Sequence, residues 1–310
     1  MNFELTEEQR LFQDAVRAFA RDNLAEGAVE RAHAGEYPRD VAKLMAENGL
    51  LGITIPEEDG GQGGSLMDAV IAIQEVAMHC PRSADVIQAG SFGAIRVLAA
   101  YGTEDQKERY LKPLLAGETL IAVGMTEPDA GSAVTDLRTT ATPDGEGLRI
   151  NGQKCFTSHS PEADVFLVYV RFGPGVDGIG SVLIPRDAEG LEFGKPTAFL
   201  GGDDWAPLFF TDVYVPPENI LLREGGFKKQ IAGFNVERIG NTARSIALGR
   251  AQLLPLFIGE RGLSAEAIQG GVDRVTRQCH GVGAGRLRLY VNARRLPRAF
   301  QCPELVKQFP

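Results

Sequence analysis

The spacing of hydrophobic residues changes once before the middle of the chain and changes back once after it. From the amino terminus to about residue 120, apolar residues recur at helical spacing. From Leu148 onward they form short β-branched or aromatic runs that Gly, Pro and Asp separate. Helical spacing returns near Phe234. The pattern therefore predicts helices, then strands, then helices, in a chain of 310 residues that is long enough for several packed layers.

Start and stop signals give these elements approximate bounds. Thr6-Glu7-Glu8-Gln9 predicts a capping box, and the helix that follows it has an apolar face over residues 11–20. Pro38 and Gly49 bound a second predicted helix. Further helices are predicted over residues 67–78, 91–101 and 104–115, and strands over residues 148–150, 165–170, 181–184 and 208–215.

Composition and charge exclude several classes of partner. Hydrophobic residues make up 44% of the chain and charged residues 24%, which is ordinary for a soluble globular protein. A formal net charge of −9 argues against nucleic acid or an anionic membrane surface as the main partner. No apolar run is long enough to cross a bilayer, and Met1 leads directly into a helix-start signal. We therefore expect a cytoplasmic location.

The cysteines and histidines do not form a recognisable site in the sequence. The four cysteines are widely separated and lack the paired spacing of a zinc site or a disulfide framework, so no metal is expected. The four histidines, including His159, have no carboxylate or nucleophile at convincing spacing. We expect these histidines to be solvated or to serve in packing.

Residues 123–132, with the sequence VGMTEPDAGS, predict a turn that presents backbone N–H donors. Pro128 fixes one φ angle, and Gly131 permits a conformation that is closed to other residues. Thr126 and Ser132 add hydroxyl groups. Such a nest suits a polar, planar or anionic ligand. The alternative is an ordinary surface turn between a helical region and a sheet.

Together with the segment NGQKCFTS at 151–158, this turn resembles the flavin-binding signature of the acyl-CoA dehydrogenase family. The resemblance continues through LTEEQ at 5–9, YGTEDQK at 101–107 and ERIG at 237–240, and it covers roughly the first four-fifths of the chain. It implies FAD as cofactor, an acyl-CoA substrate, an electron-transfer flavoprotein as electron acceptor, and the homo-oligomer of intact relatives. It also implies an α+β multidomain fold, with an N-terminal helical domain over 1–120, a small β domain over 121–230 and an incomplete C-terminal helical domain over 231–310.

The resemblance assigns roles to individual residues. It implies flavin contacts at Val123, Met125, Thr126, Gly131, Ser132, Phe156 and Ser158. It places Ser132, Asn235 and Arg238 beside the acyl-CoA, although Arg238 alternatively holds a buried glutamate or the helix start. For Phe156 the alternative is a simple core aromatic. Two departures from the family pattern are Ala133, where an aspartate is common, and Ser158-His159 in place of Thr-Asn.

The reaction that the resemblance implies needs a base that removes the α-proton of a thioester. Glu237, directly before Arg238, matches the position that a minority of the family uses for this base. Burial in an apolar acyl pocket would raise the pKa of Glu237 toward a useful range. The alternative is a surface glutamate or a local salt-bridge partner. No other carboxylate is expected nearby.

The carboxyl-terminal part departs from the family pattern. Pro255 and Gly259 fall where the family continues a long helix, so we expect this helix to be interrupted. We interpret residues 252–283 as read out of frame or as diverged without selection for helix, and the family's last segments as missing. The expected consequences are weak FAD binding, little turnover and no stable tetramer. Rival functions are the reduction of an enoyl-CoA, flavin chemistry on another substrate, and a non-catalytic remnant.

Overall fold

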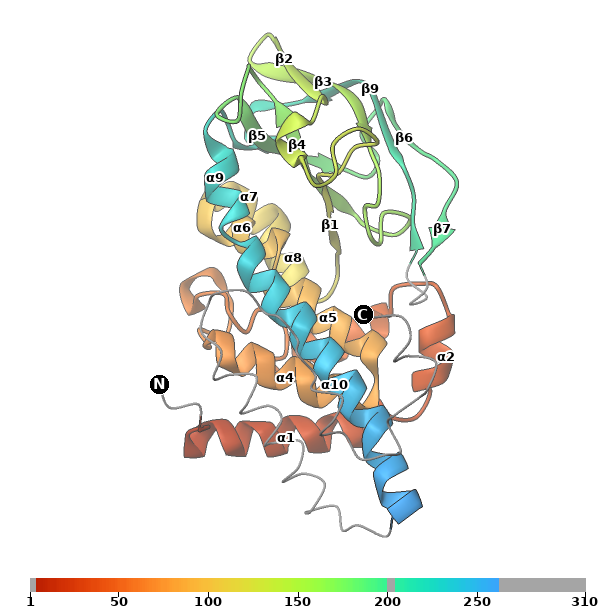
Figure 1. The fold of residues 1–310 in the computed structure, drawn as a ribbon. Coiled ribbons are helices and arrows are strands. Elements are labelled where there is room, and N and C mark those ends of the chain that lie inside the picture. Colours follow the sequence, from red (N-terminus) through yellow and green to blue (C-terminus); the bar gives the residue numbers. More distant parts are fainter. Residues whose placement is uncertain (1–3, 200–203, 262–310) are drawn as a thin grey trace, which may run out of the picture. The chain divides into compact units, whose positions relative to one another are not determined.

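A computed structural model of the chain describes residues 4–199 and 204–261. For Phe234, Asn235 and residues 252–261 it describes the backbone alone. The chain divides into two compact units, Met1–Gln252 and Leu253–Pro310. Within the first unit a group of helices precedes a sheet, and a long helix follows it (Figure 1). The fold is therefore α+β and multidomain, as predicted.

The first helix begins at the predicted capping box. The Thr6 hydroxyl accepts a hydrogen bond from the backbone N–H of Gln9, and the Gln9 side chain accepts one from the N–H of Thr6. Val16 and Ala20 on the predicted apolar face are buried, whereas Leu11 is 66% exposed and lies outside the core. The helices of this part are α1 (Glu7–Asn23), α2 (Ala28–His33), α3 (Arg39–Glu47), α4 (Leu66–His79), α5 (Pro81–Ser91), α6 (Ala94–Tyr101), α7 (Glu104–Gln106) and α8 (Lys112–Leu115), with a π-helical stretch over Lys107–Leu111 and a 3-10 turn over Glu57–Asp59.

Helix α5 was not predicted, although it forms part of one wall of the cavity described below. The sequence pattern placed a helix over residues 91–101, but α5 ends at Ser91 and α6 begins at Ala94. Pro81 occupies the first turn of α5, a position where its missing N–H is not needed. Both faces of α5 are buried, so the helix carries no amphipathic stripe that would reveal its period.

The sheet follows, with strand order β10-β5-β4-β2-β3-β9-β6, and β1 pairs with β4 in parallel. β4 and β5 pair antiparallel and are buried along nearly their whole length, which explains their continuous apolar sequences. A separate ribbon pairs β7 with β8. The strands are β1 (Ile121–Gly124), β2 (Thr140–Asp144), β3 (Gly147–Lys154), β4 (Val165–Arg171), β5 (Ile179–Pro185), β6 (Leu191–Phe193), β7 (Thr197–Ala198), β8 (Asp204–Trp205), β9 (Leu208–Val215) and β10 (Ile220–Leu222), with 3-10 turns over Val134–Asp136 and Pro217–Asn219.

Hydrogen bonds join the helical part to the sheet. Gln106 in α7 is buried, and its Nε2 donates to the carbonyls of Glu218 and Ile220 at 2.9 and 3.0 Å. Arg39 in α3 makes an ion pair with Asp164, just before β4, at 3.1 Å. These bonds join α7 to the turn and strand around β10, and α3 to the start of β4.

The last described helices are α9 (Gly226–Ile231) and α10 (Phe234–Arg261). The predicted interruption of α10 is wrong, because the helix continues through Pro255 and Gly259 to Arg261. A proline costs about 3 kcal/mol inside a helix. The several turns that precede Pro255 are already formed, so the helix can continue despite this cost. The predicted altered reading frame covers residues 252–283, of which 262–283 lie outside the described residues, and the prediction that the family's last segments are missing stays a prediction.

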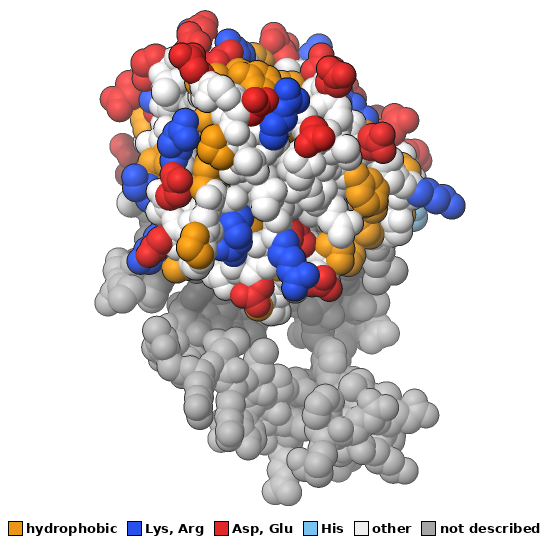
Figure 2. Space-filling model, turned by 90° about the horizontal axis from the view of Figure 1, so that it is seen from above, with side chains coloured by type: hydrophobic (Ala, Val, Ile, Leu, Met, Phe, Trp, Pro, Cys, Tyr) orange, Lys and Arg blue, Asp and Glu red, His pale blue; other side chains and the backbone are white. Residues whose placement is uncertain are grey.

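Basic and acidic side chains are interspersed with hydrophobic ones on the face seen from the sheet end (Figure 2). Among the described residues, no helix is long and apolar enough to span a membrane. Within the same part of the chain, no group of His, Cys, Asp and Glu could hold a metal ion, and Cys80 and Cys155 have free thiols.

Candidate active site

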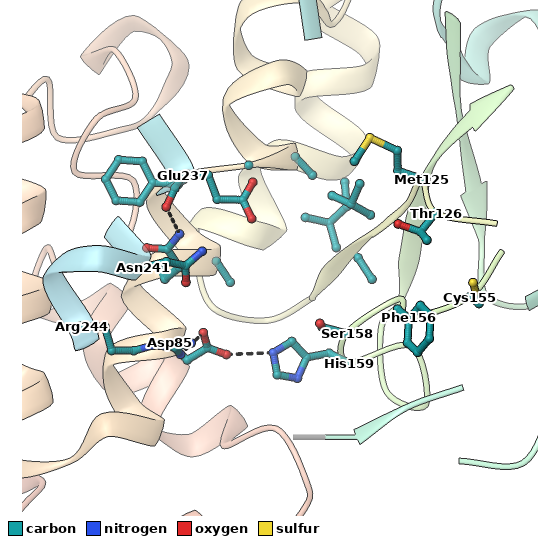
Figure 3. Close-up of a pocket in the computed structure, with 18 residues that line it drawn as sticks. Asp85, Met125, Thr126, Cys155, Phe156, Ser158, His159, Glu237, Asn241 and Arg244 are labelled. Atoms are coloured by element: carbon teal, nitrogen blue, oxygen red, sulfur yellow. Dashed lines mark hydrogen bonds and ion pairs between the residues drawn. The ribbon is translucent and has the colours of Figure 1, made fainter. Parts of the chain in front are cut away.

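A cavity of about 300 Å³ lies between the sheet and the helices of the first unit (Figure 3). β1 and the segment after β3 form one wall, and α5 and α10 form the other. The cavity therefore combines side chains that are far apart in the sequence. Its lining is Asp85, Gln88, Ala89, Phe92, Gly93, Ala94, Ile121, Ala122, Val123, Met125, Thr126, Cys155, Phe156, Ser158, His159, Glu237, Asn241 and Arg244.

The wall on the sheet side carries an exposed aromatic ring. Phe156 is 58% exposed and has a φ of 54°, a conformation that is uncommon for a bulky residue. Its ring lies 4.6 Å from that of Trp205, centroid to centroid. Phe156 is therefore not a core aromatic, because its ring faces the cavity beside the hydroxyl-bearing Thr126 and Ser158 (Figure 3). Strained backbone of this kind clusters at binding sites.

A buried ion pair holds the two halves of this wall together. Lys154 is fully buried, and its Nζ lies 2.8 Å from Glu127 Oε1 and donates to the carbonyl of Met125 at 3.2 Å. Glu127 also accepts the backbone N–H and the hydroxyl of Thr139. The N–H of Cys155 donates to the carbonyl of Thr126 at 2.9 Å. These bonds fix the end of β1 against the end of β3.

Burial disfavours the charged form of both side chains: it acts to lower the pKa of Lys154 and to raise the pKa of Glu127, and the attraction between the two charges counters it. Desolvation lowers the pKa of Lys154 to about 8 despite the charge of Glu127. For Glu127, desolvation acts to raise the pKa, but the charge of Lys154 and the hydrogen bonds outweigh it, so the pKa is lowered. The pair is therefore ionised near neutral pH.

Glu237 lies on the opposite wall, in the first turns of α10, and its carboxylate points into the cavity (Figure 3). A Cβ atom placed on Gly93 would lie 3.2 Å from Glu237 Oε2, so the glycine leaves room for the carboxylate. Burial, followed by the negative charge of Asp85, raises the pKa of Glu237, while Arg238 acts in the other direction. Glu237 is therefore not a surface glutamate.

A second carboxylate, which was not predicted, lines the same cavity. Asp85 on α5 accepts from Arg244 on α10, and its Oδ2 lies 2.9 Å from His159 Nε2 (Figure 3). The expectation that His159 is solvated or only packs is wrong, since His159 is paired with Asp85. The two residues are too far apart in the sequence for spacing to reveal this contact. Desolvation opposes ionisation of Asp85, but His159 and Arg244 lower its pKa to about 2.

The remaining predicted residues lie outside the cavity lining. Gly131 and Ser132 are exposed in the turn after β1. Arg238 is exposed on α10, one residue beyond Glu237. Asn235 belongs to the first turn of α10, and its side chain lies outside the described part of the structure. Val123 and Met125, by contrast, line the cavity with Thr126.

Comparisons with known proteins identify the family. Residues 6–118 match the acyl-CoA dehydrogenase N-terminal domain, and residues 122–213 match the acyl-CoA dehydrogenase middle domain. A probable acyl-CoA dehydrogenase of Bacillus subtilis, YngJ, is 35% identical over 260 residues, covering 82% of this chain and 68% of the relative. The chain belongs to the acyl-CoA dehydrogenase family. Acyl-CoA dehydrogenases are oxidoreductases that act on CH–CH groups, and FAD is the family's cofactor.

Two further relatives show the range of this family. Acryloyl-CoA reductase (NADH) of Anaerotignum propionicum is 36% identical over 270 residues, covering 84% of this chain and 68% of the relative. The structure of butyryl-CoA dehydrogenase from Megasphaera elsdenii matches this chain with a TM-score of 0.78 and 28% sequence identity. The match covers 91% of this chain and 78% of the butyryl-CoA dehydrogenase chain. The acyl-CoA dehydrogenase fold is thus present over most of the chain.

The cavity suits a flavin ring. An isoalloxazine needs an apolar face to stack on and polar groups along its edge. The exposed ring of Phe156 offers such a face, and the Thr126 and Ser158 hydroxyls lie on the same wall (Figure 3). Glu237 stands on the opposite wall of the cavity.

Proposed function

We propose that the chain is an FAD-dependent acyl-CoA dehydrogenase that uses Glu237 as its catalytic base. The observation that carries this proposal is the Glu237 carboxylate, which points into the cavity from α10 while Phe156 faces it from the sheet side. The α-proton of a thioester held between them goes to the carboxylate. Bound FAD supplies the acceptor for the hydrogen that leaves the β-carbon with its electron pair.

The pKa values support Glu237 rather than Asp85 as the base. A general base works best when its pKa lies near the operating pH. Burial raises the pKa of Glu237 toward that range, whereas the pKa of Asp85 is lowered to about 2. Asp85 is also already engaged by His159 and Arg244. Glu237 is thus the better proton acceptor of the two.

The binding roles follow the walls of the cavity. Val123, Met125, Thr126, Phe156 and Ser158 hold the flavin ring in this proposal. Gly131 and Ser132, in the exposed turn beyond β1, contact the remainder of FAD or the acyl-CoA. Asn235 and Arg238 contact the acyl-CoA at the start of α10.

The wider assignments are also part of the proposal. Electrons pass to an electron-transfer flavoprotein, which the family membership supports. The chain acts in the cytoplasm, and its domains meet near residues 120 and 230. The homo-oligomer is that of intact relatives, and no stable tetramer is expected of this chain. A solved relative whose title names an electron-transferring flavoprotein of Acidaminococcus fermentans is 30% identical, with a TM-score of 0.79.

A second candidate is the reverse reaction, the reduction of an enoyl-CoA. The 36% identity to acryloyl-CoA reductase supports this second candidate. The same residues would serve, because proton transfer at the α-carbon and hydrogen transfer at the β-carbon are reversible. Incubation with saturated and unsaturated thioesters, with product analysis, separates the two directions.

FAD titration of the purified chain tests the cofactor site. We expect Phe156→Ala to weaken FAD binding, since the variant removes a stacked apolar face, and Ser132→Ala to weaken it through loss of a polar contact. Helical content should be nearly unchanged in both. Leu248→Ala, on an exposed position of α10 outside the cavity, is the matched control. Equal FAD affinity in the parent and in both variants would place the flavin elsewhere.

A further inference from the structure

The wall of the cavity beyond Glu237 is polar, although an alkyl chain would need an apolar one. Asp85 from α5, His159 from the segment after β3 and Arg244 from α10 meet there (Figure 3). Their side chains are 13%, 11% and 29% exposed. We name these three residues the polar wall.

The charges in the polar wall balance. The Asp85 carboxylate accepts from Arg244 through Oδ1 and lies 2.9 Å from His159 Nε2 through Oδ2. The guanidinium and the carboxylate therefore cancel, and Glu237 adds a nearby carboxylate on the same helix. Because Arg244 is already paired with Asp85 and Glu237 lies nearby, an anionic acyl terminus at this wall would meet two carboxylates.

The polar wall nevertheless has unused hydrogen-bonding capacity. A guanidinium has five N–H donors, and among the described residues Arg244 donates one hydrogen bond, to Asp85. Each carboxylate oxygen of Asp85 has a second lone pair. Asn241, one turn before Arg244, lines the cavity as well and adds an amide. Donors and acceptors are thus available side by side, which suits a group that can both donate and accept.

Helix geometry places the polar wall away from the reacting carbons. Glu237, Asn241 and Arg244 are spaced as i, i+4 and i+7, so they share one face of α10. At 1.5 Å per residue, Arg244 lies about 10 Å along the helix from Glu237. In the proposal below, a group bound there belongs to the acyl tail, several carbons beyond the carbons that react.

We propose that the polar wall recognises a hydroxyl group on the tail of the acyl chain, so that the preferred substrate is a hydroxyacyl-CoA rather than a plain alkyl thioester. This inference rests on the proposed function. A hydroxyl donates to Asp85 and accepts from Arg244. A methyl-terminated chain would cover the remaining N–H donors of Arg244 and the second lone pairs of Asp85 without pairing them, which is the situation that makes a polar site reject an analogue lacking its hydroxyl.

The test compares straight-chain acyl-CoA thioesters of equal length that end in a methyl, a hydroxyl or a carboxylate. Calorimetric titration of the FAD-loaded chain gives the affinity for each, and flavin absorbance gives the rate of its reduction. We expect the hydroxyl-terminated thioester to exceed the methyl-terminated one at least roughly tenfold in kcat/KM. An equal or greater value for the methyl or carboxylate form overturns the proposal.

Variants of Arg244 connect the preference to the polar wall. Arg244→Met should abolish the hydroxyl preference, and Arg244→Lys should retain part of it, because a lysine still donates but lacks the planar fork. Leu248→Ala is the control and should keep the full preference. A preference unchanged in Arg244→Met, in a variant that melts like the parent, also overturns the proposal. If no thioester of any kind binds the FAD-loaded chain, the proposed function itself fails, whereas binding without preference refutes only the polar wall.

Discussion

At the scale of single residues, the cavity contains two carboxylates with opposite tendencies to accept a proton. Burial and the charge of Asp85 raise the pKa of Glu237, and the charge of Arg238 lowers it. Asp85 is buried more deeply than Glu237, and desolvation acts to raise its pKa, but His159 and Arg244 lower that pKa to about 2. The pKa values of the two carboxylates therefore differ because of their neighbours and not because of burial. Asp85 is paired with both His159 and Arg244.

The pH dependence of the reaction should report this arrangement. The base acts when deprotonated, so the rate of flavin reduction by a thioester should fall as pH drops through a pKa above the ordinary glutamate value of 4.5. Asp85→Asn removes a negative charge and should move this limb to lower pH. Arg238→Met removes a positive charge and should move it to higher pH. Stopped-flow rates from pH 5 to 8 would measure the shifts, and identical profiles in all three proteins would contradict the assignment.

Gly93 offers a second test at the residue scale. Its φ of 65° disfavours a side chain, and a Cβ there would lie 3.2 Å from Glu237 Oε2. Gly93→Ala should lower the free energy of unfolding by about 1–2 kcal/mol and also slow flavin reduction, because the carboxylate must move. Gly145→Ala is the matched control, with a φ of 61° and no atom within 4 Å of the added Cβ. It should show the loss of stability without the loss of rate. Equal rates in the two variants would mean that the position of Glu237 is not critical.

At the scale of elements, the site depends on where β1, β3, α5 and α10 end or begin. β1 and β3 deliver Thr126 and Phe156 to one wall, and their ends are joined through Lys154 and Glu127. α5 and α10 deliver Asp85 and Glu237 to the other wall. The positions of the cavity's side chains therefore depend on the contacts between these four elements.

The Lys154–Glu127 pair should dominate the stability of the sheet-side wall. Removing one member of a buried ion pair leaves an uncompensated charge, so Lys154→Met should lower the free energy of unfolding by about 3 kcal/mol. Adding Glu127→Gln to this variant should restore part of the loss. Chemical unfolding of the three proteins measures this difference. A double variant no more stable than Lys154→Met would show that the ion pair is not what holds the wall.

The sequence predicted the elements with strong local signals and missed those without them. The capping box at Thr6 and the continuous apolar strands near residues 165–170 and 181–184 were predicted, because local chemistry determines them. α5 was missed since burial on both faces removes the helical period. The interruption predicted at Pro255 and Gly259 was wrong, because a long helix tolerates isolated unfavourable residues.

At the scale of the whole molecule, one carboxylate connects three distant segments. Asp85 from the helical part binds His159 from the sheet part and Arg244 from α10. Residue spacing cannot predict such a contact, since it exists only after the parts have folded together. Glu237 and the residues of the flavin signature were recognisable in the sequence through the family pattern, whereas the polar wall became visible only in the structure.

The central claim is that Glu237 removes a proton from a thioester bound across the cavity from FAD. Anaerobic mixing of the FAD-loaded chain with an acyl-CoA thioester, followed by flavin absorbance, tests it most directly. We predict that Glu237→Gln binds FAD and thioester as the parent does but bleaches the flavin about 10²- to 10⁴-fold more slowly. Bleaching of the Glu237→Gln variant at close to the parent rate would contradict the account.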